Sequence, residues 1–264
     1  MKFQLINFKR DKVALLILIA FYIGFGVLAT IFQEKIIYHP NKQDFQACTD
    51  FSLAEKINHN GTRAYLKHNS SKLVIFYHGN AGSACDRAFM AHVFEQNGYS
   101  YLIPEYAGYS NDPIQPSHEL LKKDVENMVD FIQERKYTEM IVVGESVGTG
   151  LASHHVSLQK PDKLLLLSPF SSVLDIAKTK FWFYPVSFMV KNDFVNTDLL
   201  KDFKGEALFI HGDKDTIIPL KLGRRLFDSL GTAHKKIVIV RGAGHNNLFE
   251  FSKTYDAIAS FLKQ

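Results

Sequence analysis

Residues 141–150 read IVVGESVGTG, an apolar run and then a serine with a glycine two places before it and another two places after it. The run predicts a buried strand, and the residues from Gly148 onward predict a helix. A serine on so sharp a strand-to-helix turn has a strained backbone, and side chains at positions 144 and 148 would collide, so glycine is needed there. The turn would hold the Ser146 hydroxyl clear of the sheet. A phosphate loop is excluded because no Lys-Ser or Lys-Thr pair follows the glycines.

The chain around this turn alternates between apolar runs and helical patterns. This alternation is typical of an α/β fold with a mostly parallel central sheet and helices on both faces. An Asn60-Gly61 pair between two earlier segments predicts an antiparallel hairpin. The predicted strands are 73–77, 101–104, 140–143, 163–167, 207–210 and 237–240, and the predicted helices are 84–96, 117–135, 148–159, 219–230 and 247–263.

The interval 170–204 interrupts the alternation. It is longer than an ordinary connection and carries the aromatic cluster FWFYP at 181–185, so it predicts an inserted helical cap. The cluster favours an apolar wall over a pocket, with Trp182 and Phe183 against the substrate, although these side chains could also belong to the core. With no internal repeat or low-complexity linker in view, residues 35–264 are predicted to form one domain that contains this cap.

The N-terminal region predicts a membrane anchor. Residues 13–32 are a 20-residue stretch without a charge, long enough at about 1.5 Å per residue to span a hydrocarbon core of roughly 30 Å. The stretch is longer than the apolar part of a cleaved signal peptide and lacks a clear cleavage site. Its basic flank, with Lys9, Arg10 and Lys12, precedes it, so residues 1–12 are predicted to be cytoplasmic and the remainder extracytoplasmic. Residues 1–34 thus form the N-terminus and a single signal-anchor helix.

Composition and cysteine usage narrow the class of protein. Of 264 residues, 46% are hydrophobic and 22% are charged, which is typical of a globular protein, and the net charge of +4 comes with no basic stripe that would favour nucleic-acid binding. Cys48 and Cys85 have no zinc spacing and are either buried thiols or, in an oxidising compartment, one bridge. His154 and His155 point in different directions on a helix, so no metal site is predicted.

A reactive serine needs a base, and the base needs an orienting carboxylate. Both follow predicted strands further along the chain: LFIHGDKDTIIP offers Asp213 and Asp215, and VIVRGAGHNN offers His245. Catalytic groups in such sheets gather at the carboxyl ends of the strands, where these loops lie. The residues alone leave open which of the two aspartates orients the histidine.

A fourth element is FYHGNAGS at 76–83, after the first predicted parallel strand. A His-Gly pair followed by small residues can aim a backbone N–H at a nascent oxyanion. The N–H groups of Asn80 and Val147 are predicted to form this oxyanion hole, whereas His78 is predicted to hold the loop.

In order and position these four elements resemble those of the α/β-hydrolases. More narrowly, the chain is similar to membrane-anchored α/β-hydrolase-domain proteins, a branch that includes bud-emergence-type proteins and protein depalmitoylases. The resemblance covers residues 35–264 and implies an α/β-hydrolase fold with Ser146 as nucleophile, Asp215 as the acid and His245 as the base. It also implies an esterase-like or thioesterase-like activity without a cofactor.

Two positions depart from the pattern of that family. Residues 107–110 read Ala-Gly-Tyr-Ser where such proteins often read Arg-Gly-Tyr-Gly, which affects the pocket rim to which Tyr109 is assigned. Asn247 stands where aspartate is frequent. Neither departure touches the predicted triad.

The sequence therefore predicts a membrane-tethered serine hydrolase that cleaves an ester or thioester of a lipid-like or acylated substrate. A serine peptidase and a non-catalytic hydrolase-like membrane scaffold are the alternatives. Because the imidazole must be neutral to act as a base, activity is expected to fall as the pH drops through about 6–7.

Overall fold

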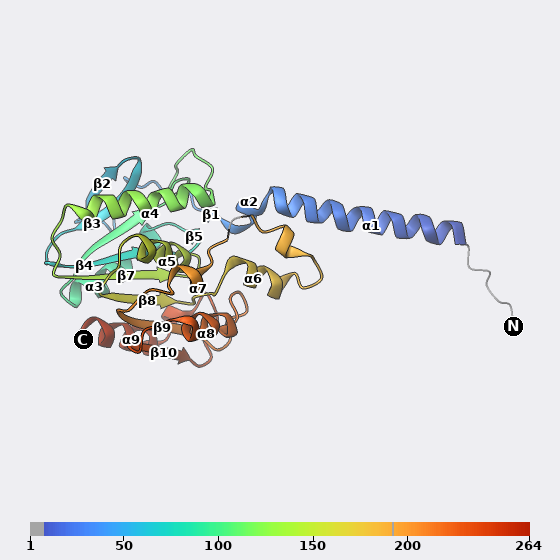
Figure 1. The fold of residues 1–264 in the computed structure, drawn as a ribbon. Coiled ribbons are helices and arrows are strands. Elements are labelled where there is room, and N and C mark those ends of the chain that lie inside the picture. Colours follow the sequence, from blue (N-terminus) through green and yellow to red (C-terminus); the bar gives the residue numbers. More distant parts are fainter. Residues whose placement is uncertain (1–7, 192) are drawn as a thin grey trace.

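The computed structural model describes residues 8–191 and 193–264, so residues 1–7 of the stretch predicted to be cytoplasmic lie outside the described residues. Within this part of the chain the central sheet has eight strands, in the order β10-β9-β8-β7-β4-β6-β3-β2 (Figure 1). The neighbouring strands from β10 to β6 pair in parallel. Strand β3 then pairs antiparallel with β6, and β2 pairs antiparallel with β3. This is the α/β-hydrolase fold, so the predicted fold class is confirmed.

The strands and helices lie close to their predicted positions. The strands are β1 (His39–Pro40), β2 (Glu55–His59), β3 (Thr62–Lys67), β4 (Lys72–Tyr77), β5 (Ala81–Gly82), β6 (Ser100–Glu105), β7 (Glu139–Glu145), β8 (Lys163–Leu167), β9 (Glu206–Gly212) and β10 (Lys235–Val240). The α-helices are α1 (Phe8–Ile31), α2 (Gln33–Ile37), α3 (Ala88–Gln96), α4 (His118–Gln133), α5 (Gly148–Leu158), α6 (Val173–Lys180), α7 (Asn196–Leu199), α8 (Leu220–Ser229) and α9 (Ser252–Leu262). Short 3₁₀ turns are η1 (Cys85–Arg87), η2 (Val186–Phe188) and η3 (Leu248–Glu250).

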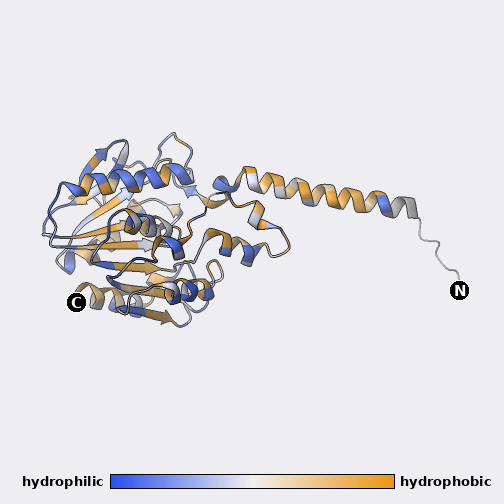
Figure 2. Ribbon diagram, in the orientation of Figure 1, coloured by the Kyte–Doolittle hydropathy of each residue, from blue (hydrophilic) through white to orange (hydrophobic). Residues whose placement is uncertain are grey.

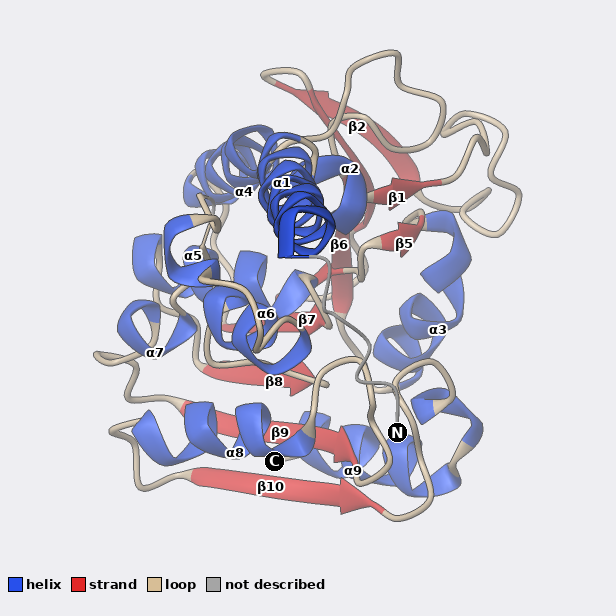
Figure 3. Ribbon diagram, turned by 90° about the vertical axis from the view of Figure 1, so that its right-hand side faces the viewer, coloured by secondary structure: helices blue, strands red, loops and turns tan. Residues whose placement is uncertain are grey.

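Each face of the sheet has its own hydrophobic core. Successive strand side chains point to opposite faces, so Leu73 and Ile75 of β4 pack with α4, α5 and α8, whereas Val74 and Phe76 pack with α3 and α9. Viewed along α1, α4 and α5 lie to the left of the strands and α3 to the right (Figure 3). Burial on both faces explains why the parallel strands are continuous apolar runs.

The hairpin of β2 and β3 turns at Asn60 and Gly61, whose φ angles are +51° and +92°. Both residues tolerate this left-handed conformation, and the sequence prediction is confirmed. The interval 170–204 contains α6, η2 and α7.

Helix α1 projects from the rest of the chain as a long apolar rod (Figures 1 and 2). Its segment Lys12–Ile31 is, by length and composition, able to cross a membrane, and very little of it is buried. A core helix of a soluble protein would bury one face, and α1 does not. At its end, α2 leads into β1, which pairs in parallel with β5 just after β4.

Cys48 and Cys85 form a disulfide with a Cα–Cα distance of 6.0 Å. Of the two states that the sequence left open, the structure has the bridge. It ties the loop before β2 to η1, directly after the glycine-rich segment that follows β4.

Candidate active site

Ser146 occupies the turn between β7 and α5 in a left-handed conformation, with φ of +53°. The turn is tight because the backbones on either side approach closely. A Cβ at Gly144 would lie 2.6 Å from the carbonyl oxygen of Gly148, and a Cβ at Gly148 would lie 2.2 Å from that of Tyr77. These close approaches explain why both positions are glycine. The Ser146 N–H donates to the carbonyl of Leu167 on β8, which ties the turn to the sheet.

A chain of hydrogen bonds leads from Ser146 through His245 to Asp215. Ser146 Oγ lies 2.8 Å from His245 Nε2, and His245 Nδ1 lies 2.7 Å from Asp215 Oδ2. The residues come from the turn after β7, the loop after β10 and the loop after β9, all at the carboxyl edge of the sheet. The structure thus brings together the three residues that the sequence selected. In this arrangement Nδ1–H donates to the carboxylate, which leaves Nε2 free to accept the serine proton.

The environment of Asp215 favours the ionised carboxylate. Burial by itself raises the pKa of Asp215, but hydrogen bonds from His211 and His245 outweigh it and hold the pKa well below its usual range. The backbone N–H groups of Ile217 and Ile218 donate to the other carboxylate oxygen at 3.0 and 2.8 Å. A fixed anion next to the imidazole stabilises the imidazolium that forms when His245 accepts a proton.

Asp213 lies apart from this chain. It is exposed, and its carboxylate accepts the N–H of Gly242 at 2.7 Å. Geometry therefore separates the two aspartates that spacing alone could not: Asp215 faces the imidazole, and Asp213 links the loop after β9 to the loop after β10.

The segment after β4 and the start of α5 provide two unused donors near Ser146. Neither the Asn80 N–H nor the Val147 N–H donates a hydrogen bond within residues 8–191 and 193–264. Asn80 lines the same cavity as Ser146, and Val147 is the N-cap of α5. His78 is buried, stacks on Tyr106 at 4.0 Å between ring centroids and lies 2.8 Å from the Gly79 carbonyl, so it has the structural environment expected for it.

The end of α2 and the start of β1 hold Asn80 in place. The His39 N–H donates to the Asn80 carbonyl at 3.1 Å, and the Asn80 side-chain amide donates to the Ile37 carbonyl at 2.6 Å. The Tyr109 hydroxyl also donates to the Asn80 carbonyl, at 2.8 Å, and its ring is buried. The assignment of Tyr109 to the substrate pocket is therefore corrected: this tyrosine supports the loop from behind.

The cavity that contains Ser146 has a volume of about 490 Å³. Besides Ser146, Asn80 and His245 it is lined by residues that the sequence analysis did not select: Gly79, Ala81, Gly82, Arg87, Phe89, Glu145, Asn246 and Phe249. Phe89 and Phe249 meet edge to face with ring centroids 5.0 Å apart and form an apolar wall. Arg87 forms a bidentate ion pair with Glu145, at 2.7 and 2.9 Å. No local sequence pattern marks these side chains, because only the fold brings η1, α3 and η3 to the serine.

Trp182 and Phe183 do not line this cavity, so their assignment to the substrate pocket is corrected as well. Their side chains are 81% and 53% exposed. They lie on the segment after α6, which packs beside α1. There the Tyr22 hydroxyl donates a hydrogen bond to the Phe183 carbonyl at 2.6 Å.

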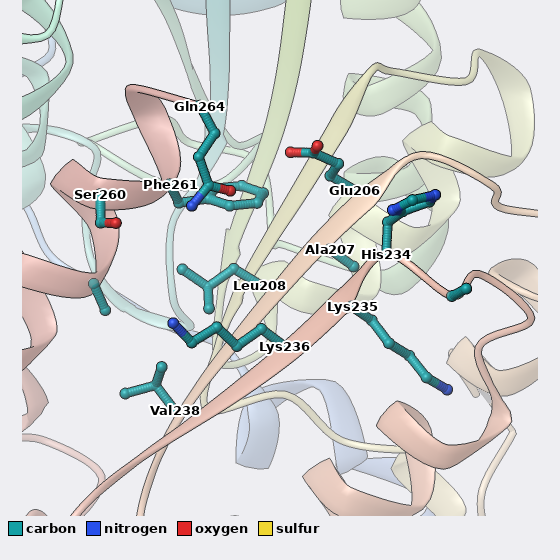
Figure 4. Close-up of a pocket in the computed structure, with 12 residues that line it drawn as sticks. Glu206, Ala207, Leu208, His234, Lys235, Lys236, Val238, Ser260, Phe261 and Gln264 are labelled. Atoms are coloured by element: carbon teal, nitrogen blue, oxygen red, sulfur yellow. The ribbon is translucent and has the colours of Figure 1, made fainter.

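A second cavity, of about 270 Å³, lies at the opposite edge of the sheet, where β9 and β10 begin (Figure 4). Its labelled side chains include Glu206, His234 and Lys236. Its place at the start of the strands separates it from Ser146. Within the described residues, no group of three or more histidine, cysteine, aspartate or glutamate side chains could hold a metal ion.

Comparison with known proteins gives both relatives and structural neighbours. No family model matches the chain. An uncharacterized protein of Mycobacterium tuberculosis is 26% identical over 275 aligned positions that cover 98% of each chain. The lysophosphatidylserine lipase ABHD12 of Bos taurus is 26% identical over 182 positions, which cover 61% of this chain but only 46% of that one. The solved structure of an esterase from Pyrococcus furiosus superposes with a TM-score of 0.66 at 17% identity, covering 85% of this chain and 98% of that one.

The sheet order, the turn at Ser146 and these structural neighbours all indicate the same fold. The chain has the α/β-hydrolase fold, with an apolar helix preceding it.

Proposed function

We propose that the chain is a membrane-anchored serine hydrolase that cleaves esters or thioesters of acylated or lipid-like substrates. The observation that carries this proposal is the hydrogen-bonded chain Ser146–His245–Asp215, with Ser146 held in a left-handed turn beside two unused N–H donors. Similarity to esterases and to lysophosphatidylserine lipases supports ester cleavage over other reactions of the fold.

In the first half-reaction His245 Nε2 accepts the Ser146 proton while Oγ attacks the substrate carbonyl carbon. The negative charge moves to the carbonyl oxygen, which the Asn80 and Val147 N–H groups stabilise. The imidazolium, stabilised by the Asp215 carboxylate, then donates its proton to the departing alkoxide or thiolate. The product of this half-reaction is an acyl-serine.

In the second half-reaction His245 removes a proton from a water molecule, which attacks the acyl-serine. The tetrahedral intermediate collapses, Ser146 Oγ regains the proton from His245, and a carboxylic acid leaves. No bond changes in this sequence require a cofactor.

The character of the cavity fits an acylated substrate. Phe89 and Phe249 offer apolar contact for an acyl chain, and each buried CH₂ contributes about 0.8 kcal/mol. The Arg87–Glu145 ion pair adds charged groups to the lining of the same cavity, where a polar leaving group fits.

Three features support an anchored, extracytoplasmic enzyme. Helix α1 is apolar and largely exposed, and its basic flank precedes it, which favours a cytoplasmic N-terminus. The Cys48–Cys85 disulfide is typical of proteins that fold in an oxidising compartment.

A fluorophosphonate probe tests the catalytic proposal directly, since it modifies only an activated serine. We expect the full-length protein in detergent to be labelled and to hydrolyse short-chain p-nitrophenyl esters. Ser146→Ala should lose both signals, with turnover lower by several orders of magnitude, because the covalent route disappears.

Ser168→Ala is the matched control. Ser168 also follows a strand and has a positive φ, of +48°, but no histidine bonds to its hydroxyl in the described part of the chain. It should be labelled as wild type is. A folded wild-type protein that neither reacts with the probe nor turns over esters would favour a non-catalytic scaffold instead.

A further inference from the structure

The segment 181–190 is an uncharged stretch with lysine on both sides. It reads FWFYPVSFMV between Lys180 and Lys191. Four of its aromatic side chains are exposed, Phe181 by 42%, Trp182 by 81%, Phe183 by 53% and Phe188 by 90%. Exposed aromatics gathered on one short segment mark an interaction surface rather than ordinary surface scatter.

This segment, hereafter the aromatic insertion, packs against α1. The rings of Tyr184 and Tyr22 stack with centroids 4.2 Å apart, and the Tyr184 hydroxyl donates to the Tyr22 carbonyl at 3.1 Å. Gly26 allows the close approach, because a Cβ there would lie 3.3 Å from the Tyr184 ring. In Figure 1 η2 and the loops around it run alongside the carboxyl-terminal part of α1.

The contact lies deep along the candidate membrane span. Tyr22 precedes Ile31, the end of α1, by nine residues, which is about 13 Å along an α-helix. The hydrocarbon core of a bilayer is roughly 30 Å thick, so the contact reaches about halfway through it. If α1 crosses a membrane, its contact with the aromatic insertion carries the insertion into the leaflet on the side of the catalytic residues.

Most backbone N–H groups of the insertion are paired, which suits a hydrocarbon environment where an unpaired backbone group is costly, whereas Trp182, Phe183 and Ser187 donate none within the described residues. Pro185 has no N–H, and the Tyr22 hydroxyl, which would otherwise have no partner among lipid chains, donates to the Phe183 carbonyl. Backbone N–H groups of six insertion residues donate within the segment or to α6: Phe181, Tyr184, Val186, Phe188, Met189 and Val190.

Next to this contact an apolar cavity of about 320 Å³ lies between α1 and α2 on one side and α6 and the insertion on the other. Phe25 and Ile36 line it from the anchor side, and Ile176, Phe181 and Val186 line it from α6 and the insertion. Water gains few hydrogen bonds among such side chains, whereas a lipid acyl chain fills the space favourably.

We propose that the aromatic insertion is embedded in the same leaflet as the carboxyl-terminal half of α1, with lipid acyl chains as its partner. Lys180 and Lys191 then lie at the headgroup level, where lysine side chains reach toward water and anionic lipid. The insertion holds the catalytic edge of the sheet against the bilayer. The proposal rests on the membrane anchor of the proposed function and is independent of the catalytic chemistry.

The chain carries a single tryptophan, Trp182, so the native protein contains its own probe. Full-length protein is reconstituted into phosphatidylcholine vesicles with bromine at defined depths on the acyl chains. We expect a blue-shifted emission, strong quenching by the brominated chains and weak quenching by aqueous acrylamide. Emission from a water-exposed indole, quenched by acrylamide and not by bromine, would overturn the insertion.

A displaced probe provides the matched control. Leu53 is 82% exposed just before β2, at the edge of the sheet away from the strand carboxyl ends. In Trp182→Phe/Leu53→Trp the indole should be quenched by acrylamide alone. Equal bromine quenching at both positions would mean nonspecific adsorption and would also overturn the proposal.

Two further readouts separate this inference from the proposed function. The Ser146→Ala protein should give the same Trp182 quenching as wild type, so a failed hydrolase assay leaves the depth result intact. Gly26→Leu should change the quenching depth, because the side chain meets Tyr184, whereas Gly24→Leu, with nothing within 4 Å of its Cβ, should not. Vesicles that float without the protein would overturn both the anchor and the insertion, while bound protein with a water-exposed Trp182 overturns the insertion alone.

Discussion

At the residue scale, the two aspartates of the HGDKD stretch can be compared directly, because they lie two positions apart in different environments. Both follow β9, but Asp215 is buried against His245 and Asp213 is exposed. In Asp215→Asn the amide oxygen can still accept the Ile217 and Ile218 N–H groups, so the loop should persist. The amide NH₂, however, would face His245 Nδ1 and stabilise the tautomer whose Nε2 carries the proton. That imidazole cannot accept a proton from Ser146.

We therefore expect Asp215→Asn to lower kcat for p-nitrophenyl butyrate by about two to four orders of magnitude. In Asp213→Asn the amide oxygen can still accept the Gly242 N–H, and the side chain does not contact His245, so this variant should keep most of the activity. Circular dichroism of both variants checks that the fold is retained. A larger loss in Asp213→Asn than in Asp215→Asn would mean that Asp213, and not Asp215, orients His245.

His118, a second residue-scale feature, links stability to pH. Burial lowers the pKa of His118 to about 4, whereas an imidazole in the unfolded chain titrates near 6.5. Between these values the unfolded chain binds a proton that the folded chain does not. The free energy of unfolding should therefore fall as the pH drops from 6.5 toward 4, by up to about 1.4 kcal/mol per pH unit.

His118→Phe should flatten this dependence by about one proton, while His92→Phe, at an exposed position, should not. Urea unfolding in detergent at pH 4.5 to 7 measures the slope. The buried His155 acts in the same direction and Asp124, whose pKa burial raises to about 6, in the opposite one, but both remain in each variant. Identical slopes in the two variants would contradict the assignment.

At the element scale the sequence predicts what periodicity and turn chemistry control. Each parallel strand is an apolar run because both sheet faces are covered, and Gly144, Ser146 and Gly148 mark the turn because backbone contacts forbid a Cβ on either side. The β1–β5 pair could not be predicted, since two residues on each side carry no periodic signal. The sequence could not place Trp182 and Phe183 correctly, because an aromatic cluster has the same pattern whether it covers a pocket or packs against a second helix.

The β1–β5 pair makes a prediction about truncation. The Ile37 carbonyl and the His39 N–H bond to Asn80, whose own N–H is a proposed oxyanion donor. A fragment of residues 33–264 keeps these bonds and should turn over short esters in detergent. A fragment of residues 42–264 loses them, so its kcat should fall between about ten- and a thousandfold, up to the cost of a lost oxyanion donor.

Thermal melting controls for loss of fold. Separate values of kcat and KM distinguish a misplaced donor, which lowers kcat, from weaker substrate binding, which raises KM. Equal kcat in two folded fragments would mean that α2 and β1 do not position Asn80.

At the scale of the whole molecule, α1 and the loops that carry Ser146, Asp215 and His245 lie on the same side of the central sheet. The strand carboxyl ends point toward the end from which α1 leaves (Figure 1), and α2 and β1 join α1 directly to the segment that carries Asn80. An acylated substrate held in the bilayer would reach Ser146 from that side. If α1 anchors the chain in a membrane as proposed, it would serve substrate supply as well as location.

The Cys48–Cys85 disulfide provides a test of the side of the membrane on which residues 35–264 lie. A bridge persists in an oxidising compartment and is reduced in the cytoplasm. In membranes prepared without reductant from a bacterial host, both cysteines should resist a maleimide reagent even in denaturant, and both should react once a reductant is added. Cys48→Ser should leave Cys85 reactive in denaturant alone and lower the free energy of unfolding by about 2–4 kcal/mol, the usual contribution of a disulfide. Two reactive thiols in the unreduced wild-type protein would instead place the catalytic residues in the cytoplasm.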